Sequence, residues 1–175
     1  MTTFTVAVAG FGWWGQHFAK RLKNHPFIRI AGIVEPFEGN HAAIRDLGLT
    51  VYDDLAVALA QDEVDAVLLA TPNLLHEEQV VQCAEAGKHV FCEKPLGLTA
   101  ASAQRSVKAC RDAGVQLGIG HERRFEPGIQ ALKASIDKGQ LGTIRHAEAA
   151  FSHDKLIGVP KGDWRTTKAV APAAG

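Results

Sequence analysis

The stretch Gly10-Phe11-Gly12-Trp13-Trp14-Gly15 spaces three glycines as GxGxxG. The apolar run from Thr5 to Ala9 before it predicts a strand, and Gln16 to Asn24 after it predicts a helix. A second predicted strand, Ile28 to Val34, ends at an acidic residue, Glu35, twenty positions after Gly15. Strand, glycine-rich turn, helix, strand and carboxylate in this order are typical of a unit that binds a dinucleotide.

Each glycine of this turn has a separate expected role. Gly10 permits the tight turn, Gly12 lets the backbone approach the pyrophosphate, and Gly15 lets the helix pack close to the strand. The phosphates would then lie at the positive end of the helix dipole. We include the intervening residues in the expected cofactor site: Phe11, Trp13 and Trp14. The alternative is a glycine-rich turn that only connects a strand to a helix.

Glu35 bears on the choice of cofactor. We expect its carboxylate to accept hydrogen bonds from the adenosine ribose hydroxyls and to repel the additional phosphate of NADP, which favours NAD. NADP stays an alternative if a nearby cation offsets this charge, and the candidates are Arg29 and His41. For Glu35 taken alone, the alternative is a solvated carboxylate.

Short apolar runs alternate with longer amphipathic runs along the chain. This pattern predicts an α/β fold, a doubly wound parallel Rossmann sheet with helices on both faces. Ala66 to Ala70 is continuously apolar, as expected for a central strand that is covered on both sides. The other expected strands lie near Thr50, at His89 to Cys92 and at Val115 to Ile119, and the helices at His41 to Leu47, Leu55 to Ala60, Leu74 to Ala86 and Thr99 to Ala113.

The sequence predicts two domains. Residues 1–123 form the dinucleotide-binding Rossmann domain, and residues 124–175 are the incomplete start of an α+β domain for substrate binding and oligomerisation. In this second part, Pro127 opens a helix to about Lys138, and Thr143 to Phe151 is strand-like. One strand cannot bury a face alone, so we do not expect this part to be a stable sheet domain by itself.

Composition excludes several classes of protein. The 175 residues carry a formal net charge of zero with dispersed basic residues, so we expect no nucleic-acid partner. The start of the chain does not resemble a signal peptide, and no apolar run approaches the length of a membrane span, so we expect a cytoplasmic protein with no membrane partner. Cys83, Cys92 and Cys110 are widely spaced, which argues against a disulfide framework and a metal site.

Two polar turns follow predicted strands at the carboxyl edge of the sheet, where ligands of open α/β sheets bind. In Thr71-Pro72-Asn73, the threonine and asparagine can line the dinucleotide, although Asn73 could instead cap the helix that contains His76. The second turn is Glu93-Lys94-Pro95. An amine held there suits proton exchange with a substrate hydroxyl during hydride transfer, and the alternative is an ordinary surface lysine.

The order of these motifs, continued by Arg124-Phe125, Pro127 and Trp164-Arg165, resembles the Gfo/Idh/MocA family of oxidoreductases. The resemblance runs over essentially the whole chain, and Glu93-Lys94-Pro95 is its most specific element. It implies NAD- or NADP-dependent oxidation or reduction of sugars, inositols or related polyols. It also implies that Lys94 is catalytic, contacting the nicotinamide ribose and the substrate, and that the Lys94–Pro95 bond is cis.

The resemblance also implies a second domain whose open sheet binds substrate on one face and supports homo-oligomers of the full-length form through the other. Thr143 to Phe151 would be the first strand of that sheet. Trp164 and Arg165 would lie near the nicotinamide and the substrate. The expected cofactor-binding set therefore also includes Thr71, Pro72, Asn73, His76, Glu93, Lys94, Pro95, Arg124, Trp164 and Arg165.

One departure from the family pattern is large. The catalytic histidine of the family lies in a GxHxxD-like motif, which His121, His146 and His153 do not occupy. We therefore expect the N-terminal half of such a dehydrogenase, which binds cofactor but is deficient in turnover. Two alternatives stay open: a non-enzymatic dinucleotide-binding or partner-binding module, and a methyltransferase, which would not need Lys94-Pro95.

Overall fold

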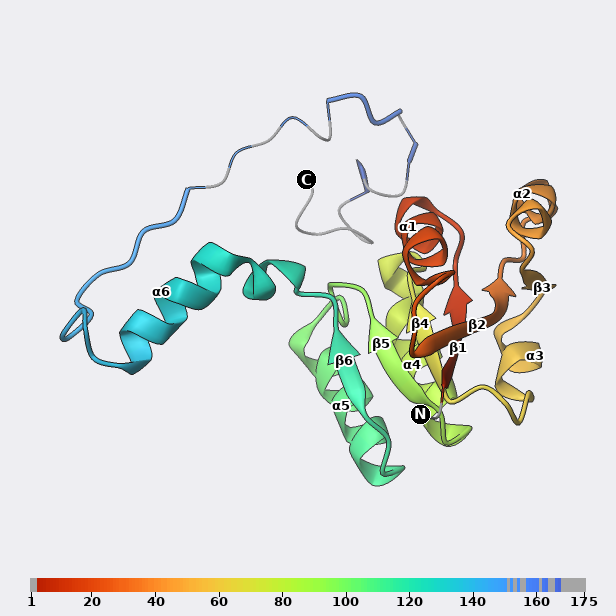
Figure 1. The fold of residues 1–175 in the computed structure, drawn as a ribbon, viewed down its shortest axis with the longest axis horizontal. Helices are drawn as coiled ribbons and strands as arrows, with labels where there is room; N and C mark the ends of the chain where they lie inside the picture. The colour runs from red at the N-terminus through yellow and green to blue at the C-terminus, as the bar shows by residue number, and fades with distance from the viewer. Residues whose placement is uncertain are drawn as a thin grey trace.

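A computed structural model of the chain describes residues 3–150, 152, 154, 157–160, 162, 163, 166 and 167. Six strands form one sheet in the order β3-β2-β1-β4-β5-β6, and every neighbouring pair is parallel (Figure 1). The strands are β1 (Phe4–Ala9), β2 (Ile28–Val34), β3 (Thr50–Tyr52), β4 (Ala66–Leu69), β5 (His89–Cys92) and β6 (Leu117–Ile119). The order reverses between β1 and β4, and this switch point is where an open α/β sheet binds its ligand.

Helices connect the strands and cover both faces of the sheet. The α-helices are α1 (Trp13–Leu22), α2 (His41–Asp46), α3 (Leu55–Leu59), α4 (His76–Glu85), α5 (Ala100–Asp112) and α6 (Pro127–Asp137). Short 3₁₀ helices include η1 (Glu38–Asn40), η2 (Asn73–Leu75) and η3 (Glu122–Phe125). The doubly wound parallel Rossmann sheet predicted from the sequence is thereby confirmed.

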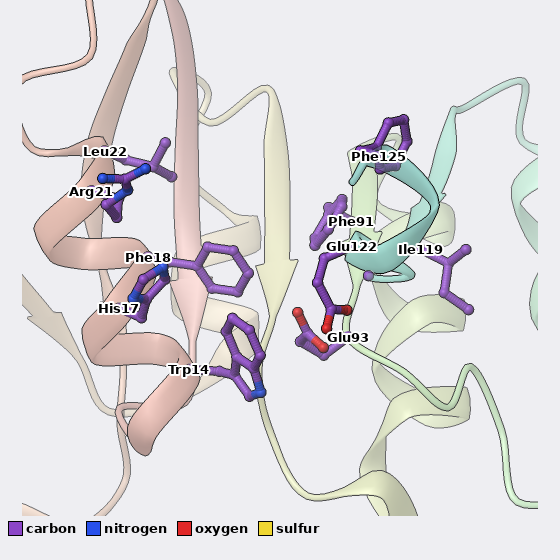
Figure 2. A pocket seen from close by; sticks show the side chains of 11 residues that line it. Trp14, His17, Phe18, Arg21, Leu22, Phe91, Glu93, Ile119, Glu122 and Phe125 are labelled. Carbon is purple, nitrogen blue, oxygen red and sulfur yellow. The ribbon is translucent and has the colours of Figure 1, made fainter. Parts of the chain in front are cut away.

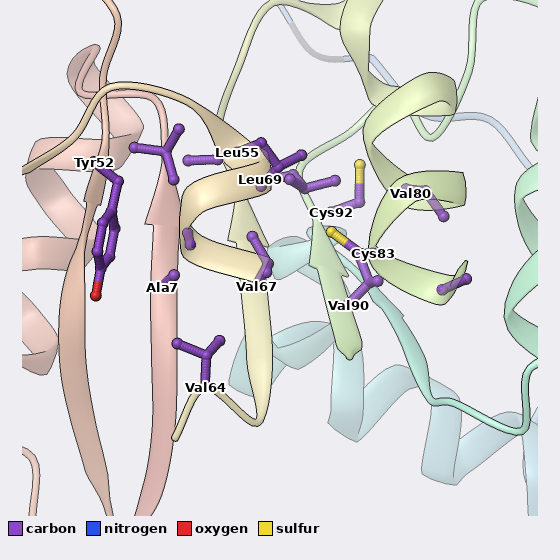
Figure 3. Packing of buried hydrophobic residues seen from close by; sticks show 14 of the residues in the cluster. Ala7, Tyr52, Leu55, Val64, Val67, Leu69, Val80, Cys83, Val90 and Cys92 are labelled. Carbon is purple, nitrogen blue, oxygen red and sulfur yellow. The ribbon is translucent and has the colours of Figure 1, made fainter. Parts of the chain in front are cut away.

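The two faces pack against different helices because side chains alternate along each strand. Val8 of β1 and Ile33 of β2 pack with Ala19 of α1 and Ile44 of α2. A second cluster on the other face joins the strands to α3, α4 and α5 (Figure 3). Its members include Ala7, Leu55, Val67, Leu69, Val80, Cys83, Val90, Cys92 and Cys110. Burial on both faces explains why the central strands are continuously apolar.

The three cysteines lie in this second cluster, buried and without a disulfide. Burial raises the pKa of the Cys83 and Cys92 thiols to about 12, so both are protonated at neutral pH. Among the described residues, no group of His, Cys, Asp and Glu side chains is arranged to hold a metal, and no helix has the length and apolar character to cross a membrane.

Helix α1 begins three positions earlier than predicted, at Trp13 instead of Gln16. Aromatic pairs four residues apart account for the difference. The Trp13 ring stacks on His17 at a centroid distance of 5.7 Å, and Trp14 contacts Phe18 at 6.0 Å. Such i,i+4 contacts stabilise the first turn, although tryptophan is only a moderate helix former. The glycine-rich turn therefore leads directly into the helix.

The predicted strand at Thr143 to Phe151 is wrong for the residues described. Residues 143–150 contain no strand and are exposed, and Phe151 lies outside the described residues. A strand is stable only when a neighbour pairs with it, and the described chain places none beside this segment.

Helix α6 points away from the sheet and exposes Ile129, Leu132 and Ile136 (Figure 1). The domain boundary after residue 123 stays a prediction.

Replacing Gly10 should destabilise the fold more than replacing another glycine of similar φ. Gly10 has a φ of +90°, and a Cβ there would lie 2.8 Å from the carbonyl oxygen of Ala70, whereas at Gly48 (φ +73°) a Cβ would meet nothing within 4 Å. Gly48→Ala should lower the free energy of unfolding by about 1 kcal/mol through φ alone. Gly10→Ala should lower it by roughly 3 kcal/mol, because overpacking adds to the strain. Urea unfolding measures both free energies. Equal losses of unfolding free energy in Gly10→Ala and Gly48→Ala would contradict the close approach of Gly10 to the end of β4.

Candidate functional site

The start of α1 is open and uncapped by any side chain. Gly12 is the N-cap residue and has no side chain to form a capping hydrogen bond, and the first turn contains no acidic residue. A Cβ at Gly12 would meet nothing within 4 Å among the described residues, so the described chain leaves room beside this glycine. Helix N-termini carry unsatisfied N–H groups and partial positive charge. The residues present therefore fit an anion such as a dinucleotide pyrophosphate.

The other two glycines allow the backbone to fold tightly behind this opening. The Gly10 amide donates to the carbonyl oxygen of Val34 at 2.8 Å, which joins the turn to the end of β2. A side chain at Gly15 would collide with the carbonyl oxygen of Gly10. Both glycines thus have the geometry that the sequence predicted, a tight turn and a close helix.

The carboxylate of Glu35 is fixed beneath the turn. Glu35 is only 8% exposed, and its Oε2 accepts from the Phe11 amide at 2.9 Å while Oε1 accepts from the Phe37 amide at 3.0 Å. The alternative of a solvated carboxylate is therefore wrong. Each carboxylate oxygen can accept a second hydrogen bond, so ribose hydroxyls still have acceptors there.

The two cations considered as neighbours of Glu35 have other partners. Arg29 lies near the start of β2, six residues or about 20 Å of strand from Glu35, and is paired with Glu63 at 2.8 Å. Nε2 of His41 lies 2.7 Å from the backbone oxygen of Glu35, not from its carboxylate. His41 Nε2 also lies 4.0 Å from Asp53, and Glu38 is a second acidic residue three positions after Glu35.

The Thr71-Pro72-Asn73 turn follows β4 at the same edge. Thr71 Oγ1 donates to Gln79 Oε1 at 2.5 Å, and Asn73 begins η2. The N-cap position of α4 belongs to Leu75, whose side chain makes no capping hydrogen bond. The alternative in which Asn73 caps this helix stays a prediction. His76 begins α4 and is fully buried, so its side chain has no surface to offer a cofactor.

The Glu93-Lys94-Pro95 turn follows β5 and combines a buried acid with an exposed amine. The Lys94–Pro95 bond is cis, as the resemblance implied, and Lys94 is exposed. Glu93 is 6% exposed, and its Oε2 accepts from the Lys94 amide at 3.2 Å. Burial raises the pKa of Glu93, and the nearby charge of Glu122 adds to the rise, while the Lys94 amide and charge oppose it.

A pocket of about 460 Å³ opens between α1 and the ends of β5 and β6. Figure 2 shows Trp14 and Phe18 of α1 facing Phe91, with the carboxylates of Glu93 and Glu122 close together at one end. The sequence did not predict this pocket, because Phe18 and Phe91 have the pattern of ordinary core residues. Its position depends on β5 and β6 lying beside α1, which is a tertiary feature.

Two exposed apolar residues at the carboxyl edge were also missed. Phe37 is 68% exposed just after β2, and Leu74 is 59% exposed just after β4, so they flank β1 and its glycine-rich turn. Both side chains are therefore accessible to a ligand at this edge. The available signal in the sequence was an apolar residue placed directly after each polar turn.

Comparison with known proteins identifies the family. A family model described as an oxidoreductase family with an NAD-binding Rossmann fold matches residues 4–121. The chain belongs to the Gfo/Idh/MocA family. The family binds NAD, and its members include dehydrogenases of inositols.

Individual members of the Gfo/Idh/MocA family show how much of such a protein this chain represents. It is 33% identical to a 2,7-anhydro-N-acetylneuraminate hydratase of Mediterraneibacter gnavus over 86% of this chain and 40% of the relative. It is 39% identical to an inositol 2-dehydrogenase of Mycolicibacterium smegmatis over 81% of this chain and 42% of the relative. The chain therefore spans about two fifths of the length of these relatives.

A solved structure of the family supports the fold and the cofactor. The WlbA dehydrogenase of Bordetella pertussis, in complex with NADH and UDP-GlcNAcA, matches with a TM-score of 0.77 and 31% identity. The match covers 82% of this chain and 42% of that one.

The remaining family motif residues lie after β6 or outside the described residues. Arg124 lies in η3 and is exposed, and its carbonyl oxygen accepts from Gln130. Trp164 and Arg165 lie outside the described residues, as does His153. The site that the described residues of this Gfo/Idh/MocA chain form thus comprises the turns after β1, β2, β4 and β5.

Charging Glu93 should destabilise this Gfo/Idh/MocA fold. Because the pKa of Glu93 is higher in the folded chain than its usual 4.5, the neutral carboxyl contributes stability that is present below 4.5 and lost as the pH rises through the folded value. The free energy of unfolding of the unmodified chain should therefore fall relative to that of Glu93→Gln between pH 4.5 and neutrality. Urea unfolding across this range measures the difference.

A matched variant tests the cause of this pH dependence. Glu122→Gln removes a charge that raises the pKa of Glu93, so the fall in stability should become smaller. Parallel stability curves for the unmodified chain and Glu93→Gln would contradict the account.

Proposed function

We propose that this chain binds NAD across the turns after β1, β2, β4 and β5, as the cofactor-binding part of an oxidoreductase. The reaction is hydride transfer between the nicotinamide and a CH–OH group of a sugar, inositol or related polyol. The observation that carries this proposal is the uncapped start of α1 beside the open Gly12, with the buried Glu35 next to it. The names of the inositol dehydrogenase and hydratase relatives support a polyol or sugar substrate.

Particular residues bind each part of the dinucleotide in this proposal. The amides that follow Gly12 hold the pyrophosphate, and Glu35 accepts from the adenosine ribose. The exposed side chains of Phe37 and Leu74 cover the two sides of the adenine, since their positions flank β1. Contact between these two side chains and the adenine would remove apolar surface from water, which favours binding.

Lys94 moves the proton of the reaction in this proposal. The bound nicotinamide supplies the hydride acceptor or donor. Lys94 Nζ accepts the proton of the substrate hydroxyl during oxidation and returns it during reduction. The exposed amine on a turn anchored by Glu93 has the freedom to reach a substrate while its backbone stays fixed.

A non-enzymatic dinucleotide-binding or partner-binding module is the second candidate. The observation in its favour is α6, which exposes Ile129, Leu132 and Ile136 at helical spacing. Such a stripe is suited to contact another polypeptide segment. Net formation of NADH from a polyol by the protein distinguishes the oxidoreductase from this module.

Removing the Glu35 carboxylate should change cofactor preference. Glu35→Ala should weaken NADH binding by about 10- to 100-fold, the range for losing hydrogen bonds to a charged group. It should also reduce the preference for NADH over NADPH, because the carboxylate that repels the additional phosphate of NADPH is gone. Titration monitored by the fluorescence of the adjacent tryptophans, Trp13 and Trp14, measures both affinities.

The control for this titration is Glu63→Ala, because Glu63 pairs with Arg29 away from the carboxyl edge. It should bind both cofactors as the unmodified chain does. Unchanged NADH affinity in Glu35→Ala would remove Glu35 from the cofactor site.

Removing the Lys94 amine should affect turnover far more than binding. In a form that also carries the substrate domain of the family, Lys94→Ala should lower kcat for NAD reduction on a panel of sugars and inositols by about 10²- to 10⁴-fold, the usual contribution of a proton-transfer group. NADH affinity should change by less than about threefold, because the lost contacts lie at one end of the cofactor. Lys88→Ala is the matched control, since the Lys88 amine donates to Gln61 on another part of the surface. Normal turnover in Lys94→Ala would show that Lys94 is not catalytic.

A further inference from the structure

His76 lies between the two turns that carry Thr71 and Lys94. Its side chain is fully buried at the start of α4. Nδ1 lies 2.7 Å from the carbonyl oxygen of Pro95, and Nε2 lies 3.0 Å from the carbonyl oxygen of Thr71. One imidazole thus contacts backbone segments that are 24 residues apart in sequence but follow neighbouring strands, β4 and β5.

Both partners of the ring are hydrogen-bond acceptors. A neutral imidazole has one N–H, so it donates to at least one of the two carbonyls whichever nitrogen carries the hydrogen. Removing the imidazole would take away its contact with each of the two carbonyl oxygens and leave a space between the turns. Buried backbone carbonyls without partners are costly, so the turns would have to move to reach water or other donors.

The segment around Lys94 is held from both sides by these contacts. The Glu93 carboxylate accepts from the Lys94 amide, and His76 contacts the carbonyl of the next residue, Pro95. Helix α4, which carries His76, is itself held by two side-chain contacts. Thr71 Oγ1 donates to Gln79 of α4, and Glu77 of α4 pairs with Arg105 of α5. The Lys94 side chain is exposed, so its direction depends on this fixed backbone.

We infer that His76 is a positioning residue that fixes the Lys94–Pro95 turn relative to the Thr71 turn and thereby shapes the nicotinamide half of the cofactor site. This inference rests on the proposed function. The adenosine half and the pyrophosphate are bound by the turns after β1 and β2, which His76 does not contact in the hydrogen bonds above. The two halves of the dinucleotide should therefore respond differently to loss of the ring.

The test compares two ligands on the same variants. NADH contains both halves, whereas ADP-ribose lacks the nicotinamide. His76→Ala should weaken NADH binding by about tenfold, the equivalent of one or two lost hydrogen-bond contacts, and change ADP-ribose binding by less than about twofold. His76→Gln, which retains an amide donor, should recover part of the NADH affinity. If His76→Ala does not fold, His76→Gln alone carries the same comparison.

His89→Ala is the matched control. His89 begins β5 at the opposite edge of the sheet, and its Nδ1 accepts from the Gln116 amide at 3.0 Å. It should bind both ligands as the unmodified chain does. An equal loss of both ligands in the His76 variants, or no loss of either, would overturn the positioning role while leaving the proposed function intact. Failure of the unmodified chain to bind either ligand would overturn the proposed function, and this inference with it.

Discussion

The contact between the Glu35 carboxylate and the Phe11 amide holds the candidate site together. It joins the end of β2 to the glycine-rich turn after β1, so a buried acid lies directly beside a helix start that no side chain caps. A carboxylate that accepts from two backbone amides has little freedom to turn away. In the proposed site, the acceptor for a ribose and the donors for a pyrophosphate are therefore held at a fixed spacing before any ligand arrives.

The reversal of strand order between β1 and β4 leaves the glycine-rich turn accessible at the edge of the sheet. Because β2 and β4 lie on either side of β1, the connections after them leave in different directions, and the turn after β1 is not covered by either. The approach of Gly10 to Ala70 and the bridge from His76 to Pro95 then link the turns after β1, β4 and β5. The turns of the proposed cofactor site therefore lie at one edge of the sheet and are linked to one another.

The sequence was sufficient for the features that depend on local pattern. Continuous apolar runs such as Ala66 to Leu69 predicted the buried strands, and the spacing from Gly15 to Glu35 predicted the dinucleotide turn. The sequence did not predict the features that depend on contacts with residues far away in the chain. The segment 143–150 has strand-like residues but no neighbouring strand, and the burial of His76 depends on how β4 and β5 pair. Such features are set by long-range packing, which residue pattern alone does not encode.

The most direct test of the account is an NMR titration of the ¹⁵N-labelled chain with NADH. The account predicts saturable shifts of the amide signals of Trp13, Trp14 and Gly15, because these amides begin α1 and would donate to the pyrophosphate. Signals from the opposite edge, such as the amide of Gln116, should stay unchanged. Shifts confined to other parts of the chain, with the start of α1 unaffected at saturating NADH, would contradict the central claim.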